Sequence, residues 1–185
     1  MMIRLFIALE IPEDIIEAIL KEKDKILGEV KDIKWETKEK LHITLKYLGD
    51  TDETLIENIK SEIESIVIKN KPFRMEVNKF GVFRHFGEPK IFWLGMKENY
   101  HLVNFVDEIE KSFRKFGYPK EERKFKPHVT LLRIRGKEDV SKLLTLLEVK
   151  LPELSFYTHK ISLIKSELKQ TGSVYTKLKS FTLKN

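Results

Sequence analysis

The sequence predicts an α+β fold with a mainly antiparallel sheet, arranged as one domain of two similar lobes. Segments with a strand-like period of two alternate along the chain with segments whose apolar residues follow helical spacing. The length of 185 residues suits one domain, or two small lobes that share a core. A pattern of histidine, aliphatic residue, threonine and leucine occurs at 42–45 and again at 128–131, and this offset of 86 positions is close to half the chain.

The first half opens with a strand and a helix. Residues 3–9 alternate in polarity as a strand does, and Pro12 marks the start of a helix that reaches about Val30. The remaining elements of this half are a strand at 41–48 that stops at Gly49, a helix at 52–68, and strands at 73–83 and 90–96 with a loop around Gly87 and Pro89 between them.

The second half repeats a comparable series. Its elements are a helix at 100–116 with a stop at Gly117, a strand at 128–134, a short helix at 138–147, and strands at 154–165 and 174–183 joined by a turn at Thr171 and Gly172. No Ser/Gly linker separates the halves, taken as 1–97 and 98–185. We therefore expect them to pack as one internally duplicated unit, in which the lobes can exchange strands.

Composition excludes several chemistries. Cysteine is absent, which rules out disulfides, thiol nucleophiles, zinc ribbons and iron–sulfur ligation. Charged residues make up 35% of the chain, with 28 Lys against 7 Arg and 22 Glu against 7 Asp. A surface rich in Lys and Glu and nearly free of glutamine is typical of hyperthermophile proteins.

We expect neither a membrane-spanning segment nor an export signal in this chain. Its apolar runs fall short of the ~20 residues that a membrane-spanning helix needs. The first ten residues alternate like a strand and reach Glu10, whereas a signal peptide has a longer apolar stretch and a small-residue cleavage site. We expect a cytoplasmic protein without membrane contact.

The repeated pattern places chemistry on two strands. Side chains alternate across a strand, so His42 and Thr44 share one face while the aliphatic residues between and after them share the other. His128 and Thr130 are arranged in the same way. If a pseudo-two-fold axis relates the halves, two imidazoles and two hydroxyls converge on one cleft.

Such a site suits a phosphodiester. One neutral histidine can deprotonate an attacking hydroxyl or water while a protonated one donates to the leaving oxygen, and the threonine hydroxyls can hold the other phosphate oxygens. Structural histidines on half-buried strands are the alternative, but their repetition in matching contexts favours a shared site. A metal site is weaker, because each strand offers one ligand and zinc catalysis normally uses three. The chain also lacks the glycine-rich loops of nucleotide-binding proteins and the G-x-S-x-G of serine hydrolases.

Basic residues concentrate around the second copy. Between Lys111 and Arg135 there are nine bases and two acids. A basic stretch beside a phosphoryl site favours an RNA substrate, and a solvated loop is the alternative.

The sequence resembles the 2H phosphoesterase superfamily and, within it, the RNA 2′,3′-cyclic phosphodiesterases, also called 2′-5′ RNA ligases. The resemblance covers almost the whole chain. It is carried by 4–9 (RLFIAL), by Trp35 and 41–49 (LHITLKYLG), by 80–83 (FGVF) and 89–93 (PKIFW), by 127–133 (PHVTLLR), and by 166–175 with Leu168 and Gly172.

This resemblance implies a bilobal fold in which two mainly antiparallel sheets with flanking helices surround a central cleft. It also implies hydrolysis of RNA 2′,3′-cyclic phosphate ends to 2′-phosphates without metal, ATP or another cofactor. Members of the family can also join RNA ends through 2′-5′ bonds. Either histidine could be the base, and we take His128 as base and His42 as acid.

Further residues are candidates to bind substrate. The resemblance implies that Arg133 binds phosphate. Arg133 lies five residues after His128, and in a regular strand this odd spacing would place it on the opposite face. A bulge, the end of the strand or the length of the side chain must bring it to the site. Lys46 shares parity with Thr44 and is a second phosphate candidate, or else a solvent-facing lysine. Aromatic residues that could stack a base are Phe6, Tyr47 and Phe125.

Two alternatives stay open. The physiological task could be 2′-5′ ligation of tRNA halves. The chain could instead be an RNA-binding module that only grips phosphates, although Lys or Arg would serve such a module as well as the paired histidines and threonines do. In either case we expect a monomer.

Overall fold

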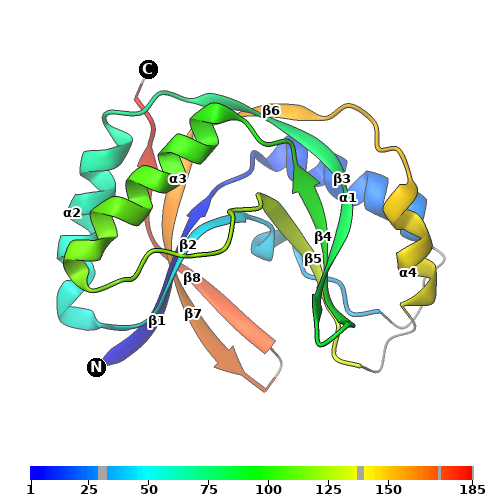
Figure 1. Cartoon of the computed structure of the whole chain (residues 1–185), viewed down its shortest axis with the longest axis horizontal. Coiled ribbons are helices and arrows are strands. Elements are labelled where there is room, and N and C mark those ends of the chain that lie inside the picture. The colour runs from blue at the N-terminus through cyan, green and yellow to red at the C-terminus, as the bar shows by residue number, and fades with distance from the viewer. Residues whose placement is uncertain (29–32, 137–139, 171, 185) are drawn as a thin grey trace.

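The computed structural model describes residues 1–28, 33–136, 140–170 and 172–184. These form an antiparallel sheet flanked by four α-helices (Figure 1). The strands are β1 (Met2–Leu9), β2 (Ile43–Asp52), β3 (Phe73–His85), β4 (Glu88–Met96), β5 (His128–Arg133), β6 (Ser155–Thr158), β7 (Lys160–Lys169) and β8 (Gly172–Thr182). The helices are α1 (Glu13–Leu27), α2 (Ile56–Val67), α3 (Tyr100–Phe113) and α4 (Ser141–Thr145). The predicted α+β class is confirmed.

The sheet has a narrow junction in the middle. Its strand order is β6-β3-β4-β5-β2-β1-β7-β8, and each neighbouring pair is antiparallel. In the described residues β2 and β5 share a single register pair, Ile43 with Val129. The structure thus joins the two expected sheets through the central residues of the two repeated patterns, which brings those patterns side by side.

Each four-stranded lobe takes strands from both halves of the sequence. The lobe of β2, β1, β7 and β8 combines the first two strands of the chain with the last two, and the other lobe contains β3 to β6. α2 packs on β8 and α3 on β2 in the first lobe, whereas α1 lies against β3 and β4 and the turn after α4 against β3 in the second (Figure 1).

Local sequence explains where the helices begin and end. Pro12 precedes α1, as predicted, and Asn99 caps α3 by accepting a hydrogen bond from the Leu102 amide at 2.8 Å. A 3₁₀ turn at Arg114–Phe116 continues α3 and ends at Gly117, which has a φ of 85°. The predicted helix ends at Val30 and at 138–139, and Thr171 of the predicted turn, lie outside the described residues.

Two strands differ from the prediction. The strand expected at 154–165 is divided at His159 into β6 and β7, because the chain passes there from one lobe to the other. β2 does not stop at Gly49 but continues to Asp52, since Gly49 has a φ of 71° that a bulged strand accommodates.

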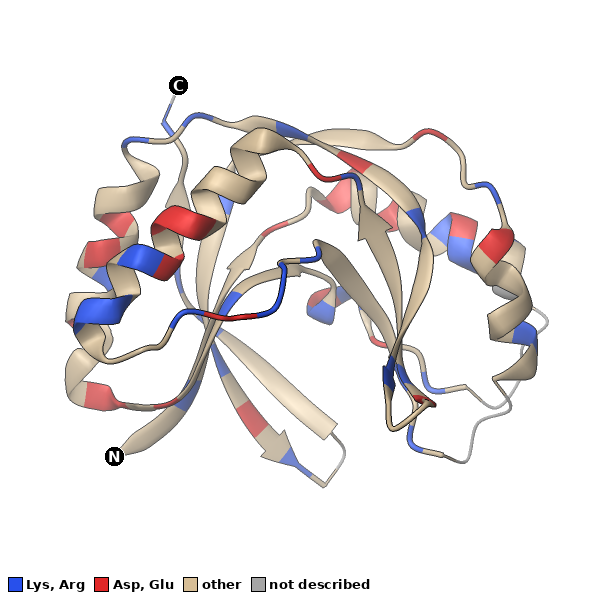
Figure 2. Cartoon of the chain, in the orientation of Figure 1, with Lys and Arg blue, Asp and Glu red and all other residues tan. Residues whose placement is uncertain are grey.

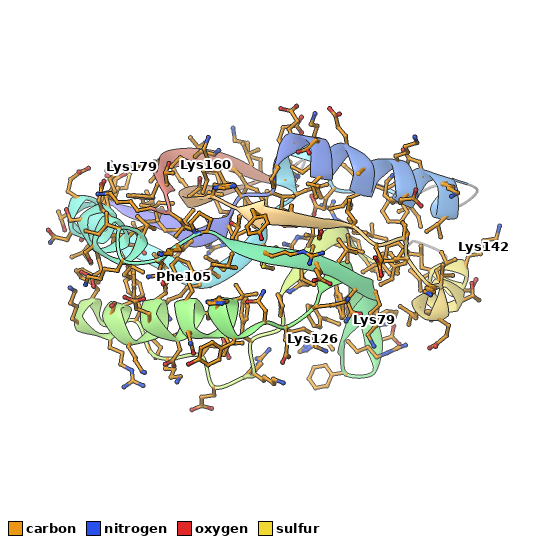
Figure 3. The ribbon with its side chains drawn as sticks, turned by 90° about the horizontal axis from the view of Figure 1, so that it is seen from above. Lys79, Phe105, Lys126, Lys142, Lys160 and Lys179 are labelled. Carbon is orange, nitrogen blue, oxygen red and sulfur yellow. The ribbon has the colours of Figure 1, made fainter. Side chains whose placement is uncertain are left out.

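The sheet separates a large core from a small apolar cluster. Side chains from both lobes and from all four helices form one buried core, which includes Phe105, seen inside the molecule in Figure 3. On the opposite face of the first lobe, Phe6, Ala8 and Ile164 form a small cluster with Tyr175. This opposite face carries the functional residues described below. No helix in the described part of the chain is long and apolar enough to cross a membrane.

Candidate active site

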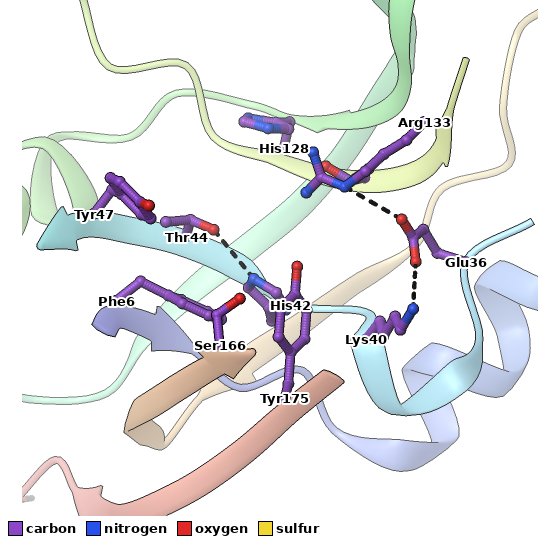
Figure 4. Close-up of a pocket in the computed structure, with 11 residues that line it drawn as sticks. Phe6, Glu36, Lys40, His42, Thr44, Tyr47, His128, Arg133, Ser166 and Tyr175 are labelled. Carbon is purple, nitrogen blue, oxygen red and sulfur yellow. Dashed lines mark hydrogen bonds and ion pairs between the residues drawn. The ribbon is translucent and has the colours of Figure 1, made fainter. Parts of the chain in front are cut away.

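A cavity of about 110 Å³ lies where the two lobes meet (Figure 4). Both histidines and both threonines of the repeated patterns line it, so the structure brings together residues that are 86 positions apart. The lining residues are Phe6, Glu36, Lys40, His42, Thr44, Tyr47, His128, Thr130, Arg133, Ser166 and Tyr175.

A bulge in β5 turns Arg133 into this cavity. Thr130 pairs with Trp93 on β4, but Leu132 pairs with Phe92, so Leu131 is an extra residue without a partner across the strand. The extra residue reverses the alternation of side chains beyond it. Arg133 therefore lies on the same face as His128 and Thr130, despite its odd spacing from His128.

A bulge in β2 has the opposite consequence for Lys46. Thr44 pairs with Ala8 and Lys46 pairs with Ile7, which makes Leu45 the extra residue and brings Tyr47 to the cavity. The expectation that Lys46 shares a face with Thr44 is wrong.

Lys46 instead points into the protein, where 5% of it is exposed. Its ammonium group lies 2.6 Å from a carboxylate oxygen of Glu110 on α3 and 3.0 Å from the Pro119 carbonyl oxygen. This buried ion pair joins α3 to the sheet. Lys46 is not among the described residues that line the cavity, so it does not have the phosphate-binding position predicted from its spacing.

His42 is held by aromatic rings and by its own segment. Its imidazole stacks on Phe6 with a centroid distance of 4.9 Å, and Tyr175 meets it edge-on at 5.6 Å. One ring nitrogen of His42 forms a hydrogen bond with the Lys40 carbonyl. A carbonyl can only accept, so this nitrogen carries the proton. In the neutral ring Nε2 is then the free acceptor, and it lies 3.1 Å from the Thr44 hydroxyl (Figure 4).

His128 is supported in the same manner. Its Nδ1 donates to the Lys126 carbonyl at 2.8 Å, which again leaves Nε2 as the acceptor of the neutral ring. Phe83 meets the ring edge-on at 4.7 Å, and the indole of Trp93 lies 6.1 Å away. A side chain at Gly81 would place its Cβ 2.1 Å from that indole, so glycine is needed there for Trp93 to lie beneath His128.

Burial keeps both imidazoles neutral at pH 7. The pKa of His42 is lowered to about 4, mainly by desolvation and in smaller part by the positive charges of Arg133 and of a protonated His128. Desolvation also lowers the pKa of His128, helped by the charges of Arg133 and Lys126. Hydrogen bonds to backbone carbonyls oppose both shifts, and the large shift belongs to His42.

An acidic residue lies between the two basic residues that line the cavity. Glu36 forms ion pairs with Arg133, whose Nε lies 3.3 Å from its carboxylate, and with the Lys40 ammonium group, also at 3.3 Å. Figure 4 shows this chain of three groups along one wall. Neither Glu36 nor Lys40 stood out in the sequence, because nothing in their spacing links them to the motif strands.

The three predicted stacking residues have different environments. Tyr47 is 58% exposed at the cavity, whereas Phe6 is 4% exposed and already stacked on His42. Phe125 packs against the main core and is not among the described residues that line the cavity. Ser166 and Tyr175, which do line it, face each other across β7 and β8, and their pairing could be found in the sequence only once the order of strands was known.

The basic stretch at 111–135 is largely paired within the protein. Lys111 and Lys120 bind Asp107 at 2.6 and 2.9 Å, and Lys124 binds Glu98 at 3.0 Å. Figure 2 shows acidic and basic segments side by side along this part of the chain. The local charge counted from the sequence therefore overstates the positive field near His128.

Among the residues that the structure describes, no three His, Asp or Glu side chains are grouped as a metal ion would require. The cavity offers two imidazoles, two threonine hydroxyls and a guanidinium group instead. Together these can transfer protons and bind an anion.

This arrangement agrees with what the chain is similar to. Residues 13–170 match the family described as the 2′-5′ RNA ligase superfamily. The chain belongs to this superfamily.

Two relatives illustrate the similarity. The chain is 34% identical over 176 residues to an RNA 2′,3′-cyclic phosphodiesterase of Aquifex aeolicus, covering 92% of this chain and 90% of the relative. It is 33% identical over 181 residues to the protein of that name from Methanocaldococcus jannaschii, covering 96% and 99%. Both comparisons support the predicted resemblance.

Solved structures share the fold of this superfamily member. TT0787 of Thermus thermophilus superposes with a TM-score of 0.79 at 24% identity, with 97% of each chain covered. E. coli LigT, in a complex with 3′-AMP, superposes with a TM-score of 0.78 at 22% identity over the full length of both chains. The bilobal 2H phosphoesterase-like fold is thereby confirmed.

Proposed function

We propose that this protein hydrolyses RNA 2′,3′-cyclic phosphate ends to 2′-phosphates by proton transfer between two histidines. The observation that carries the proposal is the convergence of His42, Thr44, His128 and Thr130 on one cavity that also holds Arg133. Relatives at 34% and 33% identity carry the name of this activity. We propose a cytoplasmic monomer that acts without metal, ATP or another cofactor.

His42 is the general base in this proposal and His128 the general acid. Of the two, His42 has the strongly lowered pKa, so it remains neutral when an anionic substrate raises the pKa of nearby imidazoles. The pKa shifts thus favour the reverse of the roles assigned from the sequence. Reversing these roles changes neither the bonds broken nor the residues required.

The reaction then proceeds by one displacement at phosphorus. A water oxygen attacks as Nε2 of His42 takes its proton, the bond from phosphorus to the ribose 3′ oxygen breaks, and His128 protonates that oxygen. The product has a 2′-phosphate and a 3′-hydroxyl, and the histidines exchange their protons with solvent. General acid–base catalysis of this kind contributes roughly 10²–10⁴-fold, and positioning adds to it.

The other cavity residues bind and orient. Thr44, Thr130 and Arg133 are placed to hold the non-bridging oxygens, and a guanidinium group can bind two of them at once. Phe6, buried under His42, orients the imidazole, and the exposed Tyr47 ring is available to stack a base.

Ligation is the second candidate, favoured by the name of the superfamily. A ribose 5′-hydroxyl in place of water would form a 2′-5′ bond through the same proton transfers. tRNA halves with a cyclic phosphate end would supply both reactants. Joined and hydrolysed products from one such RNA would measure the partition, and absence of joined product at high RNA concentration would dismiss ligation.

The decisive experiment uses an oligonucleotide with a 2′,3′-cyclic phosphate, EDTA and no ATP, with the end group of the product mapped. We expect a 2′-phosphate from the wild type and from His101→Ala, whose histidine is exposed on α3. His42→Ala and His128→Ala should each lose roughly 10²–10⁴-fold of kcat/KM, which is the range for acid–base catalysis. Full activity in either variant would refute the mechanism, and RNA binding without any turnover would favour the binding-module alternative.

The roles of the two histidines can be separated with sulfur in place of the ribose 3′ oxygen. A thiolate is a better leaving group than an alkoxide and needs no acid, since the pKa of a thiol is near ~8.5. His128→Ala should recover most of its lost rate on this substrate, while His42→Ala should not. Recovery in His42→Ala instead would exchange the assignments.

A further inference from the structure

Glu36 is an anion in a cavity built to bind an anion. Its side chain is 15% exposed, and its carboxylate lies between the guanidinium group of Arg133 and the ammonium group of Lys40. Phosphate-binding cavities gain affinity from cations, so a carboxylate at this position reduces the attraction for any phosphate. Its presence therefore requires an explanation beyond phosphate binding.

A backbone hydrogen bond and the packing of the preceding residue hold Glu36 in this position. The Glu36 amide donates to the Leu131 carbonyl at 2.9 Å, and Leu131 is the bulge residue that turns Arg133 into the cavity. The neighbouring Trp35 packs against the core, with its ring 6.3 Å from Phe92. The backbone at Leu131 therefore positions both the Glu36 carboxylate and the Arg133 guanidinium group.

The charges of the cavity wall determine which anion it balances. Among the groups that keep their charge throughout the proposed reaction, Arg133 and Lys40 contribute two positive charges to the wall and Glu36 contributes one negative charge. One net positive charge matches a phosphodiester, which carries a single negative charge. A phosphomonoester, whose second pKa is ~6, carries nearly two at pH 7.

We infer that Glu36 makes the cavity select singly charged phosphodiesters over doubly charged phosphomonoesters. On the proposed function, on which this inference rests for its biological meaning, the cyclic substrate is the singly charged species and the 2′-phosphate product the doubly charged one. Opening the ring adds negative charge next to the Glu36 carboxylate. The product is thereby repelled from the site that formed it, and the enzyme avoids product inhibition.

A merely structural Glu36 would behave differently. If it served only to orient Arg133, then Glu36→Gln, which keeps an acceptor oxygen in place, would change the binding of both ligand classes alike. A charge-selecting Glu36 predicts that the same variant strengthens the binding of monoesters far more than that of diesters. The ratio of the two affinities separates the roles.

The experiment measures binding without turnover by calorimetry at pH 7.5. The probes are 2′-AMP, a phosphomonoester, and its methyl ester, a phosphodiester of the same shape with one charge fewer. We expect Glu36→Gln to tighten 2′-AMP about tenfold more than the methyl ester, as one charge–charge interaction at this range would give. The matched control Glu39→Gln removes an exposed carboxylate of the same segment and should leave the ratio unchanged.

Two further variants check the inference. Glu36→Asp keeps the charge and should retain selection, so it also serves if the glutamine variant folds poorly. Lys40→Met should weaken 2′-AMP more than the methyl ester, the reverse of Glu36→Gln. In turnover, Glu36→Gln should show stronger inhibition by added 2′-phosphate RNA.

The outcomes distinguish this inference from the proposed function. An unchanged affinity ratio in Glu36→Gln, with both probes still bound, would overturn charge selection and leave the phosphodiesterase intact. If the wild type bound neither probe, the cavity would not be a phosphate site and both conclusions would fail.

Discussion

Tyr47 and Arg133 occupy equivalent positions on the two sides of the cavity. Each follows its motif histidine by five residues, and each is turned inward by a one-residue bulge directly after the motif threonine. The two motif strands therefore share a bulge as well as a histidine and a threonine. The side chains at these positions differ, since Arg133 places a guanidinium group at the cavity and Tyr47 places an exposed phenol ring there.

This difference predicts separate effects on substrate binding. Arg133→Gln should weaken binding of inorganic phosphate by about 10–100-fold, because a charge-assisted hydrogen bond contributes roughly 1.5–3 kcal/mol. Tyr47→Ala should leave phosphate binding unchanged. It should raise KM for RNA about 5–100-fold, from the ~1–3 kcal/mol of one base stack.

Calorimetry with phosphate and steady-state kinetics with a cyclic-phosphate oligonucleotide measure the two effects. Arg123→Gln, in an exposed arginine of the preceding loop, is the control for loss of charge. Loss of phosphate binding in Tyr47→Ala would contradict the division of roles.

The rate should have an acidic optimum. The profile of kcat/KM reports the free enzyme, in which the reaction needs His42 neutral and His128 protonated. The pKa of His42 is about 4 and that of His128 lies below its ordinary value of 6.5. Protonation of His42 removes activity below about pH 4, and deprotonation of His128 removes it as the pH rises toward neutrality.

We therefore expect kcat/KM to peak between these limits and to fall from pH 6.5 to 8. The profile of kcat should be displaced to higher pH, because the bound anion raises the pKa of His128. A kcat/KM that rises between pH 6.5 and 8 would contradict the lowered pKa values.

Lys46 should matter for stability and not for catalysis. Lys46→Met leaves the Glu110 carboxylate buried without its partner, and breaking a buried pair costs roughly 3–5 kcal/mol of unfolding free energy. The double variant Lys46→Met with Glu110→Leu should recover most of that loss. Denaturant unfolding measures both, and kcat/KM well below the melting temperature should stay near the wild-type value.

The exposed pair of Lys120 and Asp107 provides the comparison, since its loss should cost under ~1 kcal/mol. A large fall in kcat/KM for folded Lys46→Met would restore the phosphate role predicted from the sequence.

The hairpin between β3 and β4 contains a replaceable residue. Phe86 has a φ of 49° and is 93% exposed, and the Gly87 that follows has a φ of 81°. Positive φ at both turn positions favours asparagine followed by glycine. The Phe86 ring contacts the His85 ring at a centroid distance of 4.3 Å but stays almost fully exposed, so its packing offsets little of the strain. Phe86→Asn should therefore raise the unfolding free energy by about 1 kcal/mol.

The shift is measured as the midpoint of denaturant unfolding, with Phe86→Ala as the control that removes the ring without supplying a residue suited to this conformation. Equal stability of wild type and Phe86→Asn would contradict the argument.

The local pattern of the chain was sufficient for the class of fold and for the four central groups of the site. Apolar periodicity located the helices and most strands, because burying one face of an element fixes the spacing of its apolar residues within a short stretch of sequence. The repeated His-x-Thr stood out because its two copies are short and alike. The resemblance of the surrounding segments to a known family then supplied the substrate class.

Only the tertiary structure decided which further side chains join the site. Leu45 and Leu131 look like ordinary strand residues, yet their bulges depend on pairing with β1 and β4, and these bulges send Lys46 to Glu110 and Arg133 to the cavity. Glu36 reaches Arg133 because its amide binds the Leu131 carbonyl on a strand far along the chain. Contacts of this kind leave no period in the sequence, since they are set by the register of strands that meet only in the folded protein.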